Sequence, residues 1–218
     1  MKSVIIIVLL CSSGLFAQVP GFQGKRFSVE GSLMFNTALS NYNENFNEGL
    51  AAFNKRFQGG VEYIIGRNVS LGGSYGIFAS GLEDFNTKSK YRLTSNIGGL
   101  YLKIFKFRKK GAIAPYGMYG KIGLLRVMIS GVLVETNGSS AANGTEKLNP
   151  APLTLLNYGF GKQFIIKGRF IARVGADFGL NIFGFSFSSP SGITWLARKR
   201  VANGMFFNLE AGMGILIF

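Results

Sequence analysis

Seven charged residues fall on the polar side of segments in which polar and apolar residues alternate. They are Glu30, Glu62, Arg92, Lys121, Arg173, Asp177 and Glu210. A period of two is typical of a β-strand, whose successive side chains point to opposite faces. If the strands close into a barrel, these acids and bases would meet in its lumen, where charges must pair or keep water. The pattern predicts a network that fills the lumen, with a permeation path as the alternative.

The residue types needed for most enzyme sites are missing. The chain contains no histidine, and its single cysteine, Cys11, lies in the apolar N-terminal segment. Without them there can be no Ser-His-Asp or Cys-His arrangement and no histidine metal site. The glycine-rich stretches 72–76 and 117–120 do not have the spacing of phosphate-binding loops. We therefore expect no enzyme, no cofactor and no metal.

The N-terminal segment has the pattern of a secretory signal peptide. Lys2 precedes an apolar run that ends at Cys11, and small residues follow before Ala17. The run is about half the roughly 20 residues that a membrane-spanning helix needs. We predict a signal peptide over residues 1–17, which leaves one barrel domain over 18–218. Export also makes nucleic-acid binding a poor explanation of the basic composition.

The remaining chain contains about eight alternating segments. We place them near residues 25–37, 57–65, 69–79, 90–105, 116–130, 153–165, 170–182 and 207–217. Their connections alternate long and short, as in outer-membrane barrels, which have short periplasmic turns and longer external loops. The longest regions without strand character are 131–152 and 184–204. The sequence predicts an all-β fold: an eight-stranded antiparallel transmembrane up-and-down β-barrel with both termini periplasmic.

Alternation alone also fits a soluble barrel that buries its apolar face inward. Charged residues make up 16% of the chain, whereas soluble domains carry about 25%. An Arg or Lys facing the middle of a bilayer costs about 2–4 kcal/mol, so the charged faces should line the lumen. This phase puts Phe218 on the inner face with Leu216, although a terminal aromatic should face lipid. A frayed end or a shift of one residue would remove the conflict.

The excess of basic residues is assigned to the two rims of the barrel, since the lumen charges nearly balance. The formal net charge is +14. One cluster, Lys106, Arg108, Lys109 and Lys110, lies at a predicted periplasmic turn. A second, Arg198, Lys199 and Arg200, lies in the last external loop. Attraction to lipid headgroups explains both; the sharper hypothesis is that the first binds an acidic envelope protein and the second the phosphates of lipopolysaccharide.

Three features together resemble the small bacterial outer-membrane β-barrel superfamily, including the OmpA/OmpX-like and PorT-like barrels of Bacteroidota. They are the leader end Phe16-Ala-Gln18, the hairpin-linked strands, and the closing segment Gly212-Met-Gly-Ile-Leu-Ile-Phe218. The resemblance implies a non-catalytic outer-membrane protein that serves as an envelope anchor or as an accessory subunit of a membrane complex. The alternative is a small OmpW-like channel for hydrophobic or small polar solutes. A soluble periplasmic binding barrel is a third possibility.

Overall fold

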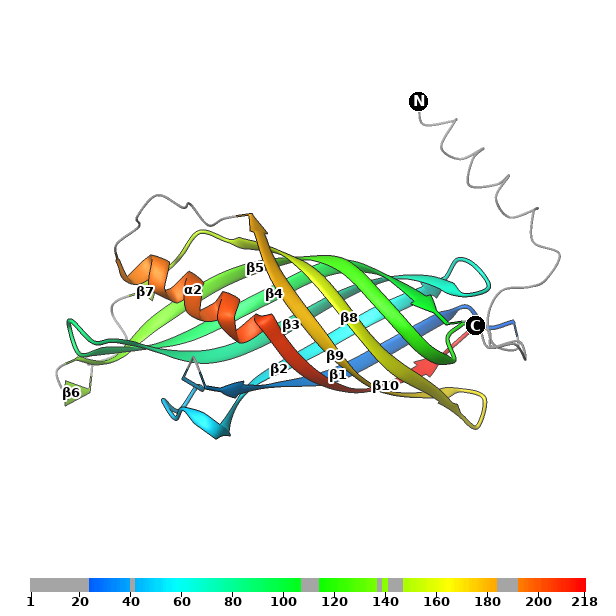
Figure 1. The fold of residues 1–218 in the computed structure, drawn as a ribbon, viewed down its shortest axis with the longest axis horizontal. Helices are drawn as coiled ribbons and strands as arrows, with labels where there is room; N and C mark the ends of the chain where they lie inside the picture. The colour runs from blue at the N-terminus through cyan, green and yellow to red at the C-terminus, as the bar shows by residue number, and fades with distance from the viewer. Residues whose placement is uncertain (1–23, 40–41, 107–113, 137–138, 141–146, 184–191) are drawn as a thin grey trace, which may run out of the picture.

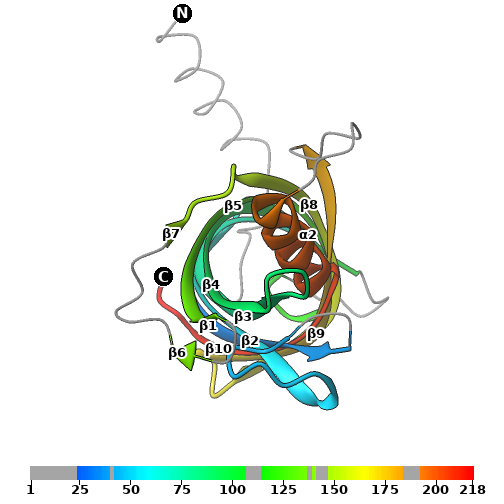
Figure 2. The same ribbon diagram turned by 90° about the vertical axis from the view of Figure 1, so that its left-hand side faces the viewer.

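The protein is described by a computed structural model over residues 24–39, 42–106, 114–136, 139–140, 147–183 and 192–218. Its long strands wrap into a closed barrel (Figure 1; Figure 2 shows the view along the barrel). They are β1 (Phe27–Ala38), β2 (Gly49–Ile64), β3 (Val69–Asp84), β4 (Ser89–Phe105), β5 (Gly117–Thr136), β8 (Leu153–Ile166), β9 (Phe170–Phe183) and β10 (Phe207–Leu216).

Each long strand pairs antiparallel with the next long strand along the chain. Strand β1 also pairs with β10, where Val29 lies opposite Ile215, and this contact closes the barrel. The short strands β6 (Ser139–Ser140) and β7 (Lys147–Leu148) both pair with the far part of β5. The prediction of an eight-stranded antiparallel up-and-down barrel is confirmed.

The two ends of the barrel differ. We call one the turn end, because the β2–β3 and β8–β9 turns lie there together with the C-terminus (Figure 1). At the opposite loop end the strands reach further than the sequence indicated: β2 begins at Gly49, β3 ends at Asp84 and β5 ends at Thr136. The β3–β4–β5 wall therefore projects beyond the rest of the barrel, into segments expected to be loops.

Helix α2 (Ile193–Phe206) occupies most of the region expected to be the last external loop. It lies within the ring of strands at the loop end (Figure 2). Ala197, Val201 and Met205 are fully buried, and their spacing of four residues places them on one face of the helix. Among the described residues, no helix is long and apolar enough to cross a membrane.

Large apolar side chains cover the outside of the barrel, and we call this surface the apolar belt. Its exposed members include Val29, Phe57, Val61, Tyr63, Leu71, Tyr75, Ile77, Leu100, Ile104, Met118, Ile122, Leu124, Tyr158, Phe160, Val174, Leu180, Leu209, Met213 and Ile215. A continuous apolar surface of this kind would promote aggregation in water. It is the surface that a barrel needs where it contacts hydrocarbon.

The inward placement of Phe218 is wrong. Strand β10 ends at Leu216, which is buried, and both Ile217 and Phe218 beyond it are exposed on the outside. The Phe218 ring stacks on that of Phe27, with centroids 5.4 Å apart. The alternation of side chains predicts which face a residue occupies only within the strand. Here the strand ends two residues before the C-terminus, so the prediction does not apply to Phe218.

Candidate functional site

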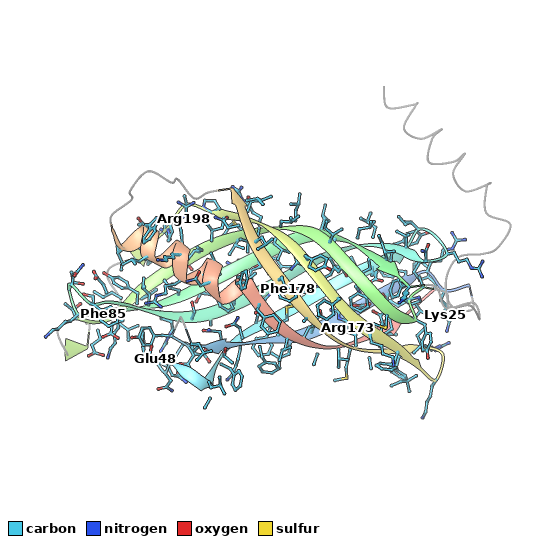
Figure 3. The ribbon with its side chains drawn as sticks, viewed as in Figure 1. Lys25, Glu48, Phe85, Arg173, Phe178 and Arg198 are labelled. Carbon is cyan, nitrogen blue, oxygen red and sulfur yellow. The ribbon has the colours of Figure 1, made fainter. Side chains whose placement is uncertain are left out.

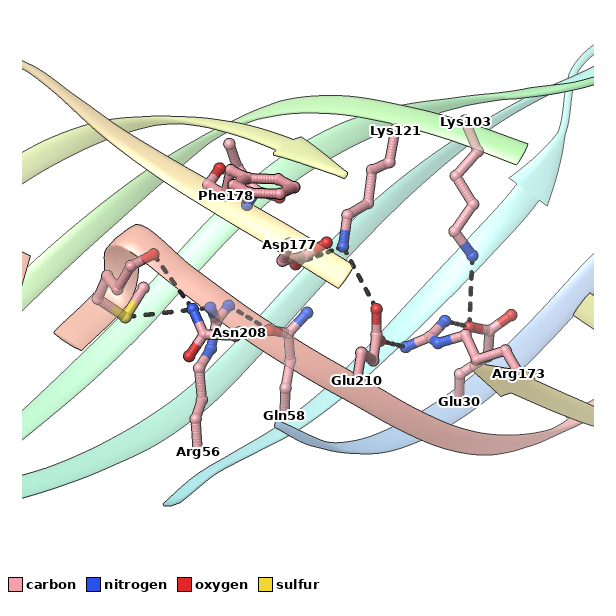
Figure 4. A network of polar contacts seen from close by, with 12 residues as sticks. Glu30, Arg56, Gln58, Lys103, Lys121, Arg173, Asp177, Phe178, Asn208 and Glu210 are labelled. Carbon is pink, nitrogen blue, oxygen red and sulfur yellow. Dashed lines mark hydrogen bonds and ion pairs between the residues drawn. The ribbon is translucent and has the colours of Figure 1, made fainter. Parts of the chain in front are cut away.

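The lumen contains a continuous network of buried ion pairs, which we call the ionic layer (Figure 4; Arg173 is labelled within the barrel in Figure 3). Its members come from six strands: Glu30 on β1, Glu62 on β2, Lys103 on β4, Lys121 on β5, Arg173 and Asp177 on β9, and Glu210 on β10. Each side chain is at most 7% exposed. Charges so far from solvent require direct partners, because their desolvation is otherwise costly.

Arg173 lies at the centre of the ionic layer. Its guanidinium pairs with Glu30 through Nη1 and with Glu210 through Nη2, the latter at 2.7 Å. Lys103 extends the network from Glu30, whose Oε2 lies 3.6 Å from Lys103 Nζ, to Glu62, with which it forms a direct pair. One arginine thus joins carboxylates from two neighbouring strands that close the barrel.

Lys121 continues the network on the other side of Glu210. Its Nζ lies 3.7 Å from Glu210 Oε2 and 2.7 Å from Asp177 Oδ2. Every carboxylate of the ionic layer therefore has at least one cation within ion-pair distance. The network links strands across the lumen, so it fills the interior of the barrel as well as neutralising it.

Six of the seven residues expected inside the lumen are members of the ionic layer, and Arg92 is the exception. Arg92 is exposed on the outside of β4, while Tyr91, Leu93 and Ile97 are buried inside. The inner face of β4 is apolar at the loop end because it packs against helix α2. The expected assignment, which put the apolar side chains of this strand toward lipid, is therefore reversed.

Sequence reasoning missed two lumen cations, Lys103 and Arg56. Lys103 has the same parity as the buried residues of β4. Because the sequence analysis assigned that face of β4 to lipid, Lys103 was not expected in the lumen. Arg56 has the parity of Glu62, but β2 was expected to begin at Phe57, one residue later. A longer strand would have identified it. With Arg56 included, the described residues place four buried acids and four buried bases in the lumen.

Arg56 lies at the boundary between the ionic layer and the helix. It is 1% exposed, its Nη1 lies 4.0 Å from Sδ of Met205, and its Nη2 donates to Gln58. Asn208 also meets the helix here, donating from Nδ2 to the carbonyl oxygen of Met205 at 3.1 Å. These contacts connect the polar interior to the last turn of α2.

Beyond this boundary the lumen is filled by apolar side chains, which we call the helix layer. Ala197, Val201 and Met205 of α2 pack there against buried residues of the barrel wall. The wall residues are Phe78, Leu82, Tyr91, Leu93, Ile97, Leu125, Val127, Ile129, Leu148, Leu153 and Leu155. Close-packed apolar interiors contain few voids large enough for water. The ionic layer and the helix layer therefore obstruct the lumen in series.

The two basic clusters have different settings. Lys106 is exposed at the turn end, whereas Arg108, Lys109 and Lys110 lie outside the described residues.

The second cluster lies on helix α2 rather than on an open loop. Lys199 is exposed with its Nζ 5.0 Å from the Trp195 ring, and the Arg200 guanidinium lies 5.6 Å from the Tyr42 ring. Arg198 is half-buried. The helix therefore holds these three cations at the mouth of the barrel.

Comparison with solved structures finds the same fold at low sequence identity. The N-terminal β-barrel domain of Pseudomonas aeruginosa OprF is 13% identical, with a TM-score of 0.50, over 88% of this chain and 97% of that chain. Neisserial surface protein A gives 10% and 0.47, covering 88% and 97%. Ail of Yersinia pestis, solved with the heparin analogue sucrose octasulfate, gives 14% and 0.44, covering 88% and 96%.

No family model matches the chain, and no curated protein does. The similarity to the OprF domain supports the closed barrel fold and extends no further.

Proposed function

We propose that this protein is a non-catalytic integral outer-membrane β-barrel with a sealed lumen, and that it serves as an envelope anchor or as an accessory subunit of a membrane complex. The observation that carries this proposal is the combination of an apolar outer surface with two obstructing layers inside. A barrel with this exterior is suited to a bilayer, and one with this interior is suited to holding its loops and turns in place.

The membrane location is tested by fractionation. The protein should appear in the outer-membrane fraction and require detergent for extraction, because the apolar belt cannot be exposed to water. Recovery in the soluble periplasmic fraction would instead support a soluble binding barrel.

The orientation follows from the lengths of the connections. We propose that the turn end faces the periplasm, with both termini, and that the loop end faces the exterior. Cys11 is the only cysteine of the sequence and lies in the predicted leader, so single cysteines can be introduced at Thr87 and Lys167, which are exposed at opposite ends. A membrane-impermeant thiol reagent should label Thr87→Cys in intact cells and Lys167→Cys only after the outer membrane is opened. The reverse pattern would contradict the orientation.

The anchor proposal and the channel alternative differ in conductance. Purified protein in planar bilayers should show no stable, reproducible pores, because both layers obstruct the lumen. Val201→Glu should loosen α2 from the mouth, since it buries a carboxylate among apolar side chains. The variant should gain protease sensitivity in the helix and still not conduct, because the ionic layer remains. Asn203→Glu is the matched control, since Asn203 is exposed on the same helix. Steady pores in the unmodified protein would favour the OmpW-like channel.

A further inference from the structure

Arg126 is a charged residue on the mostly apolar outer face of β5. It is exposed, and the next outward residues on either side, Leu124 and Met128, are each 53% exposed. Its Nη1 donates to Oγ1 of Thr154 on β8 at 3.3 Å. No carboxylate of the described residues forms an ion pair with it, in contrast to the cations of the ionic layer.

Arg126 lies at one end of a groove on the outside of the barrel. The groove has a volume of about 420 Å³ and crosses β4 and β5; its apolar walls include Leu100, Ile122 and Leu124. Gly98, the β4 residue directly opposite Arg126, helps to form its floor. A Cβ atom added at Gly98 would meet no atom within 4 Å, so a side chain is missing here where space would permit one.

Along the barrel axis, Arg126 lies at the level expected for the lipid headgroups. From Met118 near the turn end, β5 rises about 20 Å along the axis before reaching Arg126, at about 3.4 Å per residue and a tilt of about 40°. The apolar band of an outer-membrane barrel is about 25 Å tall. Arg126 therefore lies near the loop-end boundary of the band, with the apolar part of the groove below it in hydrocarbon.

We propose that this groove binds a phosphorylated glycolipid of the loop-end leaflet, of the lipid A type, with an acyl chain along Leu100, Ile122 and Leu124 and a phosphate on Arg126. The inference rests on the proposed membrane location and adds a specific ligand site to it. Charge complementarity selects the occupant. Within the described part of the chain no carboxylate pairs with this guanidinium at the edge of hydrocarbon, and a lipid phosphate supplies two oxygens in the geometry that guanidinium binds.

A second outer groove provides an internal comparison. It has a volume of about 720 Å³, crosses β10, β1, β2 and β3, and includes Gly31 and Gly59. A Cβ atom at Gly31 would likewise meet nothing within 4 Å. Its only charged lining residue, Arg173, belongs to the ionic layer and already pairs with two carboxylates inside the barrel. This groove can accommodate an acyl chain, but its arginine is already paired and does not offer a binding group for a lipid phosphate. We therefore expect no selectivity for phosphorylated lipids there.

The test measures binding of bis-phosphorylated lipid A to the detergent-solubilised protein by native mass spectrometry. Arg126→Gln should weaken binding about tenfold, because a charge-assisted contact is lost. Gly98→Leu should also weaken it by filling the groove, whereas the matched control Gly31→Leu should bind like the unmodified protein. Removing the phosphates from lipid A should have the same effect as removing the guanidinium. The unmodified protein should therefore bind dephosphorylated lipid A as weakly as Arg126→Gln binds the phosphorylated form.

Two results would overturn the proposal. One is equal lipid binding by the unmodified protein, Arg126→Gln and Gly98→Leu. The other is displacement of lipid A by millimolar inorganic phosphate, which would make Arg126 a site for a free anion. A failure of the membrane location is recognised separately, because the protein would then be soluble without detergent.

Discussion

The ionic layer and the helix layer fill neighbouring parts of the lumen with opposite chemistry, within the same wall. Toward the turn end, Glu30, Lys103 and Arg173 belong to a network of buried charges. Toward the loop end, Leu93 and Val127 belong to the apolar cluster that includes the buried face of helix α2. Both sets point inward from regular strands. The comparison shows that the inward face of a barrel strand is polar or apolar according to what fills the lumen at that height.

The two layers should also respond differently when a side chain is removed. Arg173→Met keeps an unbranched side chain of similar length but leaves Glu30 and Glu210 without their shared cation. We expect a loss of about 3–5 kcal/mol. Lys103 and Lys121 stay near Glu30 and Glu210, but the lumen then holds one more buried carboxylate than buried cations among the described residues. The free energy of unfolding, from urea titration in lipid vesicles, measures this loss.

Arg92→Met is the control for that experiment. It makes the same chemical change on the outside of β4, where Arg92 is exposed. Its effect should stay within about 0.5 kcal/mol, as for surface substitutions in general. Equal losses for the two variants would mean that the ionic layer does not hold its carboxylates through Arg173.

The same contrast explains how much could be predicted from the sequence. In the part filled by charges, the rule that sparse ionic residues face the lumen pointed to six residues that the structure buries: Glu30, Glu62, Lys121, Arg173, Asp177 and Glu210. The closed barrel and the strand order followed from alternation and connection length. These features depend on local pattern and on the cost of a charge in hydrocarbon.

In the part filled by the helix, the same rule failed. It assigned Arg92 to the lumen because it assumed a polar interior along the whole barrel. The helix that invalidates this assumption was detectable: Ala197, Val201 and Met205 recur every four residues, a helical spacing within a segment interpreted as a loop. What no local pattern could provide is that this helix folds back into the barrel, since that depends on the wall residues it meets.

A cavity in the helix layer should cost less than a buried unpaired charge. Leu93→Ala removes a fully buried side chain that packs in this layer. We expect a loss of about 2–5 kcal/mol, from lost burial and the cavity that remains. The measurement is again vesicle unfolding.

Combining Leu93→Ala with Arg173→Met tests whether the layers are independent. The two residues share no partner, so the losses should add within about 0.5 kcal/mol. A larger deviation would show that the layers are coupled, with Arg56 and its contact to Met205 as the candidate link. Met205→Ala in the same background would then reduce the coupling.

The smallest effect is expected for an ion pair outside the lumen. Lys90 Nζ lies 3.0 Å from Glu135 Oε2 at the loop end, a shorter distance than the 3.6 Å between Lys103 and Glu30, yet both side chains are about 30% exposed. Solvent and salt screen such a pair, so Lys90→Ala should lower the free energy of unfolding far less than Arg173→Met does. That loss should shrink further in 1 M salt, whereas the loss for Arg173→Met should persist because its partners are buried. An equal salt dependence of the two variants would contradict this explanation. Burial would then not be the property that distinguishes the ion pairs of the ionic layer from the exposed pair at the loop end, and only the geometry of the pairs could account for any difference in their strength.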